Sequence, residues 1–575
     1  MSDVDRGVPP RPVAPPFGAP PAFPGGVSDE QALARLMNDL FRAVPGAASS
    51  TPPAWLEATG TGPAPEPRLP AHGGPAGGFG APPPGMPSPT GPSPTVPPLT
   101  DAIPDAAVIA ARLALPRPPA VPVGGPLYFL AEATPPAGRV PAGPHSASQA
   151  SPPASPLASP LAPTGHPPFD AHRYRRDFPI LDQRVNGRPL IWLDNAATTQ
   201  KPQSVIDRLV HYYRHENSNI HRAAHELAAR STDAYEAARK SLRRFINAGS
   251  VDEIVFVRGA TEAINLVAQS WGRKNLTAGD EIVITWLEHH ANIVPWQRVA
   301  AETGARLRVA PVDDHGQIRL DEYERLLGPR TKLVALTQVS NALGTVTPAR
   351  LMVEMARRHG ARVLVDGAQS VSHMRTDVQA LDADWFVLSG HKMFGPTGIG
   401  VLYGRKDLLD AMPPWQGGGN MIKDVTFERT EYHAAPARFE AGTGNIADAV
   451  GLGAAAEYLE RIGMEAIAHH EHALLVHGTR LLEAVPGLRL VGTAAEKAGV
   501  LSFVLEGIAP LEVGQALNRD GIAVRAGHHC AQPILRRFGL EATVRPSLAF
   551  YNSFEDLDAL AAALHRIRSR ASLRR

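Results

Sequence analysis

A lysine in the middle of the chain stands where a lysine is unexpected. Residues 384–400 read DWFVLSGHKMFGPTGIG, so Lys392 follows a buried apolar strand and precedes a glycine-rich turn. Lysine is normally solvated, but burial lowers the pKa of its amine and makes the amine available to react with a carbonyl group. Ser389 and His391, directly beside it, have side chains that can bind a phosphate. The segment therefore indicates a reactive lysine next to an anion site.

A carboxylate and a second anion-binding turn extend this pattern. Residues 362–369 read RVLVDGAQ, which places Asp366 where a strand ends and Gln369 three residues later. Residues 258–263 (RGATEA) follow another strand and open a helix, so that backbone N–H groups and the Thr261 hydroxyl form a natural phosphate cradle. An aspartate at a strand end is common in α/β proteins and carries little weight alone. A lysine, an acid for a ring nitrogen and a phosphate site are together what a protein supplies to pyridoxal 5'-phosphate (PLP). Asp366 would keep the ring nitrogen protonated, and Gln369 would reach the phenolic oxygen.

The single cysteine, Cys530, is a candidate nucleophile. A lone cysteine is more often a small buried hydrophobe. Cys530, however, follows Gly527, His528 and His529, which form a polar turn, and imidazoles nearby would favour the thiolate that attacks sulfur. One cysteine excludes an internal disulfide framework and a multi-cysteine metal site, so we predict no metal and, as compartment, the reducing cytosol.

The elements that position these residues begin near residue 169. Amphipathic helical stretches, such as 321–327 and 351–358, separate apolar strand-like runs. These runs are 254–257, 281–285, 333–337, 362–365 and 385–388. Such alternation predicts an α/β fold with a mostly parallel sheet covered on both faces, and ligands in such sheets bind at the carboxyl ends of the strands.

The first 168 residues have a different composition. They contain 42 of the 57 prolines, which excludes continuous helix or sheet and predicts a disordered arm rich in proline, alanine and glycine. Three short apolar islands interrupt the arm, at residues 28–44, 105–115 and 126–131. They are either incidental patches or docking motifs that order on binding a partner, and we favour docking.

Charge and hydropathy exclude other classes of function. The formal net charge is +1, and the longest basic run has only a few residues, so we expect no nucleic-acid partner. No stretch approaches the roughly 18 uncharged apolar residues needed to span a bilayer, so we expect no membrane segment. The first residues, MSDVDRGVPPRP, lack the basic and apolar regions of a secretory signal.

Taken together, these segments resemble a known family. Residues 366–369 and 389–392, with Thr261 upstream, resemble fold-type I PLP enzymes of the class V aminotransferase group. Further stretches narrow the resemblance to group II (Suf-type) cysteine desulfurases and selenocysteine lyases. These are LDNAA at 193–197, EHHAN at 288–292, VRAGHHCAQ at 524–532 and RPSLAFYN at 545–552.

The resemblance runs continuously from residue 169 to residue 575. It implies a large PLP-binding domain at 169–445, whose first residues pack on a smaller α+β domain. That smaller domain, at 446–575, would carry the nucleophilic cysteine.

The resemblance also implies roles for individual residues. Lys392 would hold the cofactor and move protons, and His289 would stack on the cofactor ring and shuttle protons. Asn341 would contact the ring oxygen or the substrate. Arg545 would clamp the substrate carboxylate through a bidentate pair. Ala197 would lie against the substrate, whose sulfur Cys530 would attack.

A further loop implies a homodimer. Residues 438–445 (RFEAGTGN) resemble a loop whose threonine, here Thr443, reaches the phosphate of the neighbouring subunit. Relatives commonly have proline where this chain has Gly444, which puts the rigidity of the loop in doubt. Other histidines stay open: His290 and His528 have structural or functional roles. His221 and His225 line a substrate entrance or lie on a solvated helix face.

The implied activity is a cysteine desulfurase that converts L-cysteine to L-alanine. The sulfur would remain as a persulfide on Cys530 and pass to an acceptor protein or a small thiol. Selenocysteine lyase and cysteine-sulfinate desulfinase are the alternatives that share this framework. The proline-rich arm resembles that of the cysteine desulfurase cargo of family 2 encapsulin nanocompartments, which implies a shell protein as partner. A scaffold role, or an arm that binds an iron–sulfur assembly partner, are further alternatives.

Overall fold

The computed structural model describes residues 169–221 and 225–572. The predicted arm, with its islands at 28–44, 105–115 and 126–131, lies outside the described residues.

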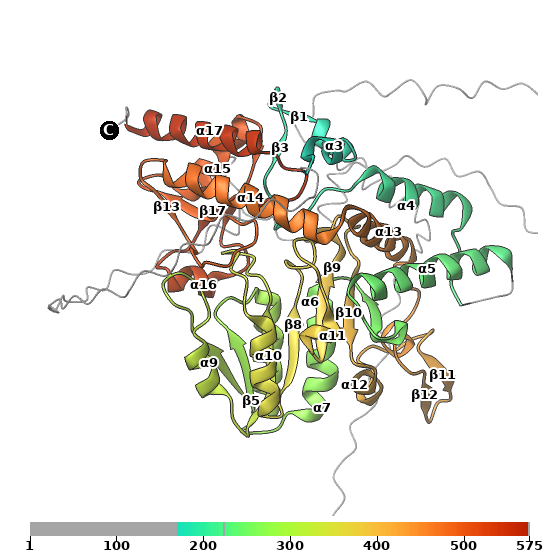
Figure 1. Cartoon of the computed structure of the whole chain (residues 1–575). Coiled ribbons are helices and arrows are strands. Elements are labelled where there is room, and N and C mark those ends of the chain that lie inside the picture. Colours follow the sequence, from blue (N-terminus) through green and yellow to red (C-terminus); the bar gives the residue numbers. More distant parts are fainter. Residues whose placement is uncertain (1–168, 222–224, 573–575) are drawn as a thin grey trace, which may run out of the picture. The chain divides into compact units, whose positions relative to one another are not determined.

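A seven-stranded sheet forms the centre of the larger lobe (Figure 1). Five neighbouring strands are parallel, and β10 runs antiparallel between β4 and β9. In spatial order the strands are β4 (Ile254–Val257), β10 (Gly400–Gly404), β9 (Trp385–Ser389), β8 (Arg362–Asp366), β7 (Thr331–Thr337), β5 (Glu281–Thr285) and β6 (Arg306–Ala310). The predicted mostly parallel α/β fold is confirmed.

Successive side chains of a strand point to opposite faces of the sheet, and here both sets are buried. In β9, Phe386 and Leu388 join one hydrophobic cluster, whereas Trp385 and Val387 join a second cluster on the opposite face. Helices cover each face. The first cluster includes residues of α5 (Glu226–Phe245), α9 (Leu320–Leu326), α10 (Ala349–Arg358), α11 (Val378–Leu381) and α13 (Ile446–Ile462). The second includes residues of α6 (Ala260–Val267), α8 (Val294–Thr303) and α12 (Lys406–Ala411).

Further helices and short strands complete the described chain. The helix α4 (Gln203–His215) packs against α13, and α13 also packs along α5. The remaining short elements are α3 (Ala171–Arg175), α7 (Arg273–Asn275), β1 (Arg184–Val185), β2 (Arg188–Pro189), β11 (Ile422–Val425) and β12 (Thr430–Tyr432).

The C-terminal lobe is built on a four-stranded antiparallel sheet. Its strands, in spatial order, are β13 (Leu488–Leu490), β14 (Phe503–Leu505), β17 (Thr543–Arg545) and β16 (Arg525–Gly527). Its helices are α14 (Met464–Glu483), α15 (Pro510–Arg519), α16 (Gln532–Arg537) and α17 (Phe554–Ser572), and Figure 1 shows α14, α15 and α17 together in orange and red. An early segment belongs here too, since β3 (Ile191–Trp192) pairs in parallel with β15 (Ile522–Ala523).

Within residues 169–221 and 225–572, no helix is both long and apolar enough to cross a bilayer.

Candidate active site

The carboxyl ends of β7, β8 and β9 face one cavity of about 220 Å³. The N-terminus of α6 and the turns of the C-terminal lobe close its other sides. Eleven of the twelve residues named from the sequence line it. They are Ala197, Thr261, His289, Asn341, Asp366, Gln369, Ser389, His391, Lys392, Cys530 and Arg545.

Lys392 stands at the end of a short turn, Gly390–Lys392, that directly follows β9. The side chain retains partial accessibility, and the residue lines the cavity. Burial in the surrounding protein lowers the pKa of its amine to about 8, although the charges of Asp366 and Cys530 act in the opposite direction. With this pKa, about one Lys392 amine in ten is uncharged at pH 7, and the uncharged amine is the form that can react as a nucleophile or base.

Asp366 is the last residue of β8 and is buried beside the lysine. Burial raises the pKa of this carboxyl, while a hydrogen bond from Ala368 N (2.9 Å) and the charge of Lys392 offset part of that effect. A protonated ring nitrogen placed next to Asp366 would favour the carboxylate and be held by it. Gln369 lies at the same end of the cavity, where its Nε2 donates to the carbonyl of Ala196 (2.7 Å).

The segments that the sequence predicts to bind a phosphate lie along the same cavity. Ser389 Oγ accepts a hydrogen bond from Ala260 N (2.9 Å), which leaves the Ser389 hydroxyl hydrogen free to bind an anion. Thr261 follows in the first turn of α6 and lines the same cavity. His391, the residue before Lys392, also lines the cavity, and burial together with the charges of Lys392 and Lys201 lowers the pKa of its ring to about 4.

His289 is held as a neutral imidazole. Its Nδ1 accepts from Ala291 N (3.0 Å), so the proton of the neutral ring is on Nε2. Burial, with the positive charges of Lys392, His290 and Arg545, lowers the pKa of the ring to about 3. A neutral ring can stack on a planar group and move a proton at Nε2.

Arg545 is a buried guanidinium with one nitrogen left without a partner among the described residues. The guanidinium is 2% exposed and ends β17, with Nη2 on Asp194 Oδ1 (3.2 Å) and Nη1 on the carbonyl of Asn341 (2.8 Å). Its Nε and the Asn341 Oδ1 are buried without a hydrogen-bond partner among the described residues. Buried polar groups without partners are costly, which indicates that a ligand satisfies them.

Cys530 occupies a turn with an unusual backbone. His529 and Cys530 both have left-handed φ values, 55° and 54°, which non-glycine residues rarely adopt. Hydrogen bonds hold the turn: Cys530 N donates to His528 Nδ1 (3.0 Å), and His290 N donates to the carbonyl of Cys530 (2.8 Å). The ring of His290 also stacks on that of His528 at 5.9 Å, so both residues support the turn.

Four residues of the site have no role in the sequence-based prediction. Arg525 and His529 line the cavity, and Asp194 binds Arg545. Glu288 is fully buried, and this burial raises the pKa of its carboxyl to about 8. Hydrogen bonds from Thr285, Asn292 and the N–H of Thr337 offset part of that effect. All four lie inside the stretches that carry the family resemblance, which is the signal that could have found them.

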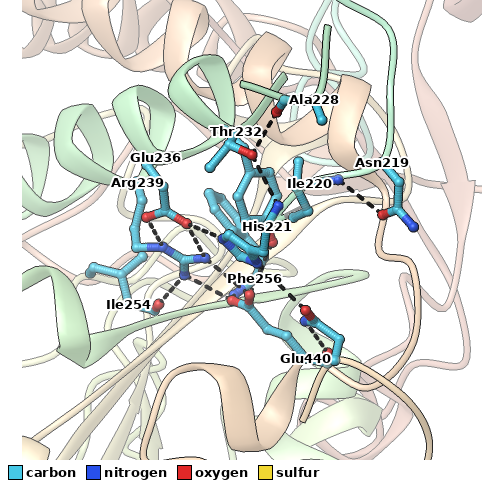
Figure 2. A network of polar contacts seen from close by, with 12 residues as sticks. Asn219, Ile220, His221, Ala228, Thr232, Glu236, Arg239, Ile254, Phe256 and Glu440 are labelled. Carbon is cyan, nitrogen blue, oxygen red and sulfur yellow. Dashed lines mark hydrogen bonds and ion pairs between the residues drawn. The ribbon is translucent and has the colours of Figure 1, made fainter. Parts of the chain in front are cut away.

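Of the twelve residues assigned to the site from the sequence, Thr443 is the one that does not line this cavity. It lies exposed in the loop before α13, beside a different hollow that is also lined by Asn219, His221 and Asn420. A buried network fixes the start of this loop through Glu440 (Figure 2). His221 lines this second hollow, and His225 caps α5, so neither lines the cavity of Lys392.

The network in Figure 2 centres on Arg239, which is 2% exposed. Its guanidinium binds Glu440 (2.8 and 3.0 Å), Glu236 (3.0 Å) and the carbonyl of Ile254 (2.6 Å). Glu236 in turn binds the ring of His221 (3.1 Å). The loop that carries Thr443 is therefore tied to α5 and to β4.

Comparison with known proteins agrees with this geometry. The model of the aminotransferase class-V family matches residues 191–560. The chain belongs to the class V aminotransferase family. Members of this family depend on PLP.

Several relatives of this class V aminotransferase chain carry more specific names. A "Cysteine desulfurase" of Synechococcus elongatus is 76% identical over 401 residues, which are 70% of this chain and 64% of that protein. A "Probable cysteine desulfurase 1" of Mycobacterium leprae is 68% identical over 69% of this chain and 65% of its own length. The chain thus spans slightly less than two thirds of these relatives. A "Cysteine desulfurase" of Klebsiella pneumoniae is 51% identical over 69% of this chain and 98% of its own length.

Solved structures show the same fold. The cysteine desulfurase CsdA (S-sulfonic acid) of Escherichia coli has a TM-score of 0.65 and 39% identity, over 70% of this chain and 99% of its own. The apo cysteine desulfurase of Thermococcus onnurineus has a TM-score of 0.66 and 38% identity, over 69% of this chain and 97% of its own.

The residues of the cavity fit PLP on their own chemistry. Lys392 has an amine of lowered pKa, and the buried Asp366 forms no salt bridge among the described residues. The first turn of α6, with Ser389, offers hydrogen-bond donors to a phosphate. The unpartnered atoms of Asn341 and Arg545 remain for a substrate. These residues would hold the cofactor at the carboxyl ends of β8 and β9.

Proposed function

We propose that the chain is a PLP-dependent cysteine desulfurase that converts L-cysteine to L-alanine and retains the sulfur as a persulfide on Cys530. The observation that carries the proposal is that Lys392, Arg545 and Cys530 line one cavity. A base, a carboxylate clamp and a sulfur nucleophile are the three groups that this reaction requires. The names of the relatives from S. elongatus and K. pneumoniae support it.

Each residue contributes a defined step. When bound, PLP supplies an electron sink for the bonds to the substrate α-carbon. Arg545 binds the substrate carboxylate, supported by its contact with Asp194, and so orients the bond that is to be broken. Lys392 takes the α-proton and later returns a proton to the product, and Asp366 holds the ring nitrogen in its protonated form.

The sulfur step belongs to Cys530. Its thiolate attacks the sulfur of the substrate, a new S–S bond forms, and the bond between the substrate carbon and sulfur breaks. His289, neutral and protonated at Nε2, is placed to shuttle the proton that the departing carbon acquires. With no second cysteine in the chain, another molecule must accept the persulfide sulfur, either an acceptor protein or a small thiol.

The experiment measures alanine and sulfide released from L-cysteine in the presence of a reductant, for wild type and Cys530→Ser, with selenocysteine and cysteine sulfinate in parallel. Sulfide that appears with wild type and vanishes with the variant supports the proposal. If neither protein processes cysteine while the variant still processes selenocysteine, the chain is a selenocysteine lyase. Turnover of the sulfinate alone would make it a desulfinase.

We further propose a homodimer in which Thr443 reaches the phosphate of the partner's cofactor. Its exposed place in a loop held by buried contacts supports this, because a residue that serves its own subunit would line the cavity. Thr443→Val should weaken cofactor retention in the dimer. Unchanged retention would remove the role.

The arm, by its resemblance to encapsulin cargo, is proposed to direct the enzyme to a protein shell. Deleting residues 1–168 should abolish co-purification with a co-expressed shell protein of encapsulin family 2 while desulfurase activity is retained. Unchanged loading of the truncated enzyme would contradict the proposal.

A further inference from the structure

A side chain from elsewhere in the chain bridges the end of the turn that carries Lys392, just after Met393 N closes that turn on the carbonyl of Gly390 (3.0 Å). In a 3₁₀ turn, the carbonyl of one residue accepts from the N–H three positions later, which would pair His391 with Phe394. Instead, Phe394 N donates to Thr199 Oγ1 (2.7 Å), and the Thr199 hydroxyl donates to the carbonyl of His391 (3.2 Å). The hydroxyl is thus inserted into the position of the direct backbone bond.

The bridged residue, Phe394, has an unusual backbone conformation. Phe394 adopts a left-handed conformation with φ of 65°, which is an outlier for a bulky residue. Phe394 and Thr199 are nevertheless both buried, at 0% and 1% exposure. The contacts of the surrounding residues must therefore maintain this strained backbone conformation.

Further donors converge on the same carbonyl oxygen. Thr199 N lies 3.0 Å from the His391 carbonyl, Thr198 Oγ1 lies 3.0 Å from it, and Lys201 Nζ lies 3.4 Å from it. A carbonyl oxygen has two lone pairs, so several donors around it restrict the direction in which the carbonyl can point. The planar peptide that joins His391 to Lys392 is therefore fixed in orientation, and the Cα of Lys392 is fixed with it.

The donors belong to one segment, residues 194–201, which we call the strap. The strap also reaches the rest of the cavity, because Asp194 binds Arg545 and the carbonyl of Ala196 accepts from Gln369. The same eight residues thus contact the peptide that precedes the base, the carboxylate clamp and the ring-oxygen ligand of the proposed reaction.

We propose that Thr199 is a positioning residue for Lys392. Its hydroxyl, inserted between the Phe394 N–H and the His391 carbonyl, orients the peptide on which Lys392 stands and so sets how the amine meets the cofactor. The inference rests on the proposed function only in assigning Lys392 to PLP.

The test compares three variants of the full-length holoenzyme with wild type. Thr199→Val has nearly the same shape but lacks the hydroxyl, and Thr199→Ser retains it. Thr376→Val is the matched control, since Thr376 is also buried but its hydroxyl has no partner among the described residues. The first readout is the absorbance of the bound cofactor titrated over about pH 6–10, which reports protonation at the bond between Lys392 and PLP. The second is the kinetics of alanine formation from L-cysteine.

Thr199→Val should shift the titration midpoint by about half a pH unit or more. It should also lower kcat by about tenfold to 100-fold with little change in KM, because the amine is displaced while the carboxylate clamp is intact. Thr199→Ser should return both values close to wild type, and Thr376→Val should not change them. A Thr199→Val enzyme with the wild-type midpoint and kcat overturns the proposal, and so does an equal effect of Thr376→Val.

If Thr199→Val does not fold, Thr198→Val serves in its place. It removes one donor to the same carbonyl from a half-buried position and leaves the Phe394 contact intact. A smaller shift of the midpoint in the holoenzyme is expected, and an unchanged midpoint overturns the proposal. Failure of the proposed function can be told apart from failure of this inference. A wild-type enzyme that binds PLP but releases no sulfur from cysteine would refute the proposed function, yet its titration midpoint could still be compared with that of the variants.

Discussion

Replacing Arg239 by methionine should lower the free energy of unfolding by about 3–5 kcal/mol. The guanidinium is buried and makes the hydrogen bonds that neutralise Glu440, which is itself 7% exposed on its side chain. Methionine fills a similar volume but leaves the carboxylate of Glu440 with only Phe256 N (2.8 Å) and Tyr235 Oη (3.1 Å). An ionised carboxylate in that environment has lost its counter-charge, and this loss dominates the effect.

The reciprocal change should be milder. Glu440→Gln keeps one carbonyl oxygen as acceptor, and Arg239 retains Glu236 (3.0 Å) and the carbonyl of Ile254 (2.6 Å). The expected loss is about 1–3 kcal/mol, the typical effect of weakening buried hydrogen bonds. The double variant should lose less than the sum of the two, because each single change already breaks the shared contact.

The assay is equilibrium unfolding in urea, followed by far-UV circular dichroism and tryptophan fluorescence, with stability read from the midpoint at unchanged slope. Arg244→Met is the matched control on the same helix, since Arg244 binds Glu460 at 2.7 Å but is 55% exposed on its side chain. An exposed pair contributes about 1 kcal/mol or less. The reasoning is refuted if Arg239→Met loses no more stability than Arg244→Met, or if Glu440→Gln is the most damaging of the three.

Three further expectations concern the site and its surroundings. Lys392→Ala should lower single-turnover alanine formation by about 10²–10⁴-fold, because a positioned base is lost; a variant within twofold of wild type would exclude Lys392 as that base. Arg545→Lys should raise KM for L-cysteine about tenfold or more, since an ammonium cannot form the bidentate pair; steady-state kinetics at saturating PLP measure this, and an unchanged KM contradicts the clamp. Burial alone would lower the pKa of His373, but the charge of Glu471 and its hydrogen bond (2.6 Å) raise the pKa above its ordinary value. The stabilisation is then fully present below about pH 6.5 and is lost as pH rises through the raised pKa, so the urea midpoints of wild type and Glu471→Gln should differ more at low pH than at high pH; a constant difference would contradict the assignment.

The central strands could be predicted almost to the residue. The runs 254–257 and 281–285 coincide with β4 and β5, and 362–365 differs from β8 by one residue. These strands can be predicted because a strand buried on both faces requires uninterrupted apolar residues. Glycine or acidic residues mark the ends of the apolar runs. Strand β6 (RLRVA) was not predicted, since it lies at the sheet edge and its side chains are largely polar or partly exposed.

The site could be predicted where its chemistry is local. Asp366 and Lys392 follow strands, and the structure brings them to the same cavity, as ligand binding at the carboxyl ends of strands requires. The insertion of Thr199 into the lysine turn has no such local signal, because the contact joins residues 195 positions apart. Glu288 could be found only through the resemblance carried by residues 288–292, because its buried environment arises from contacts with Thr285, Asn292 and Thr337.

The pairing of β3 with β15 and of Asp194 with Arg545 has a consequence for synthesis on the ribosome. Asp194 and Arg545 are 351 residues apart, so Asp194 must wait roughly 20–70 s for its partner at typical elongation rates of about 5–20 residues per second. The larger lobe can collapse during that time, but the carboxylate clamp cannot be assembled before residue 545 has emerged. Cys530 emerges shortly before Arg545, so under the proposed function no nascent chain has the substrate clamp without its nucleophile. Folding order alone would then keep an unfinished chain from binding cysteine before Cys530 can take the sulfur.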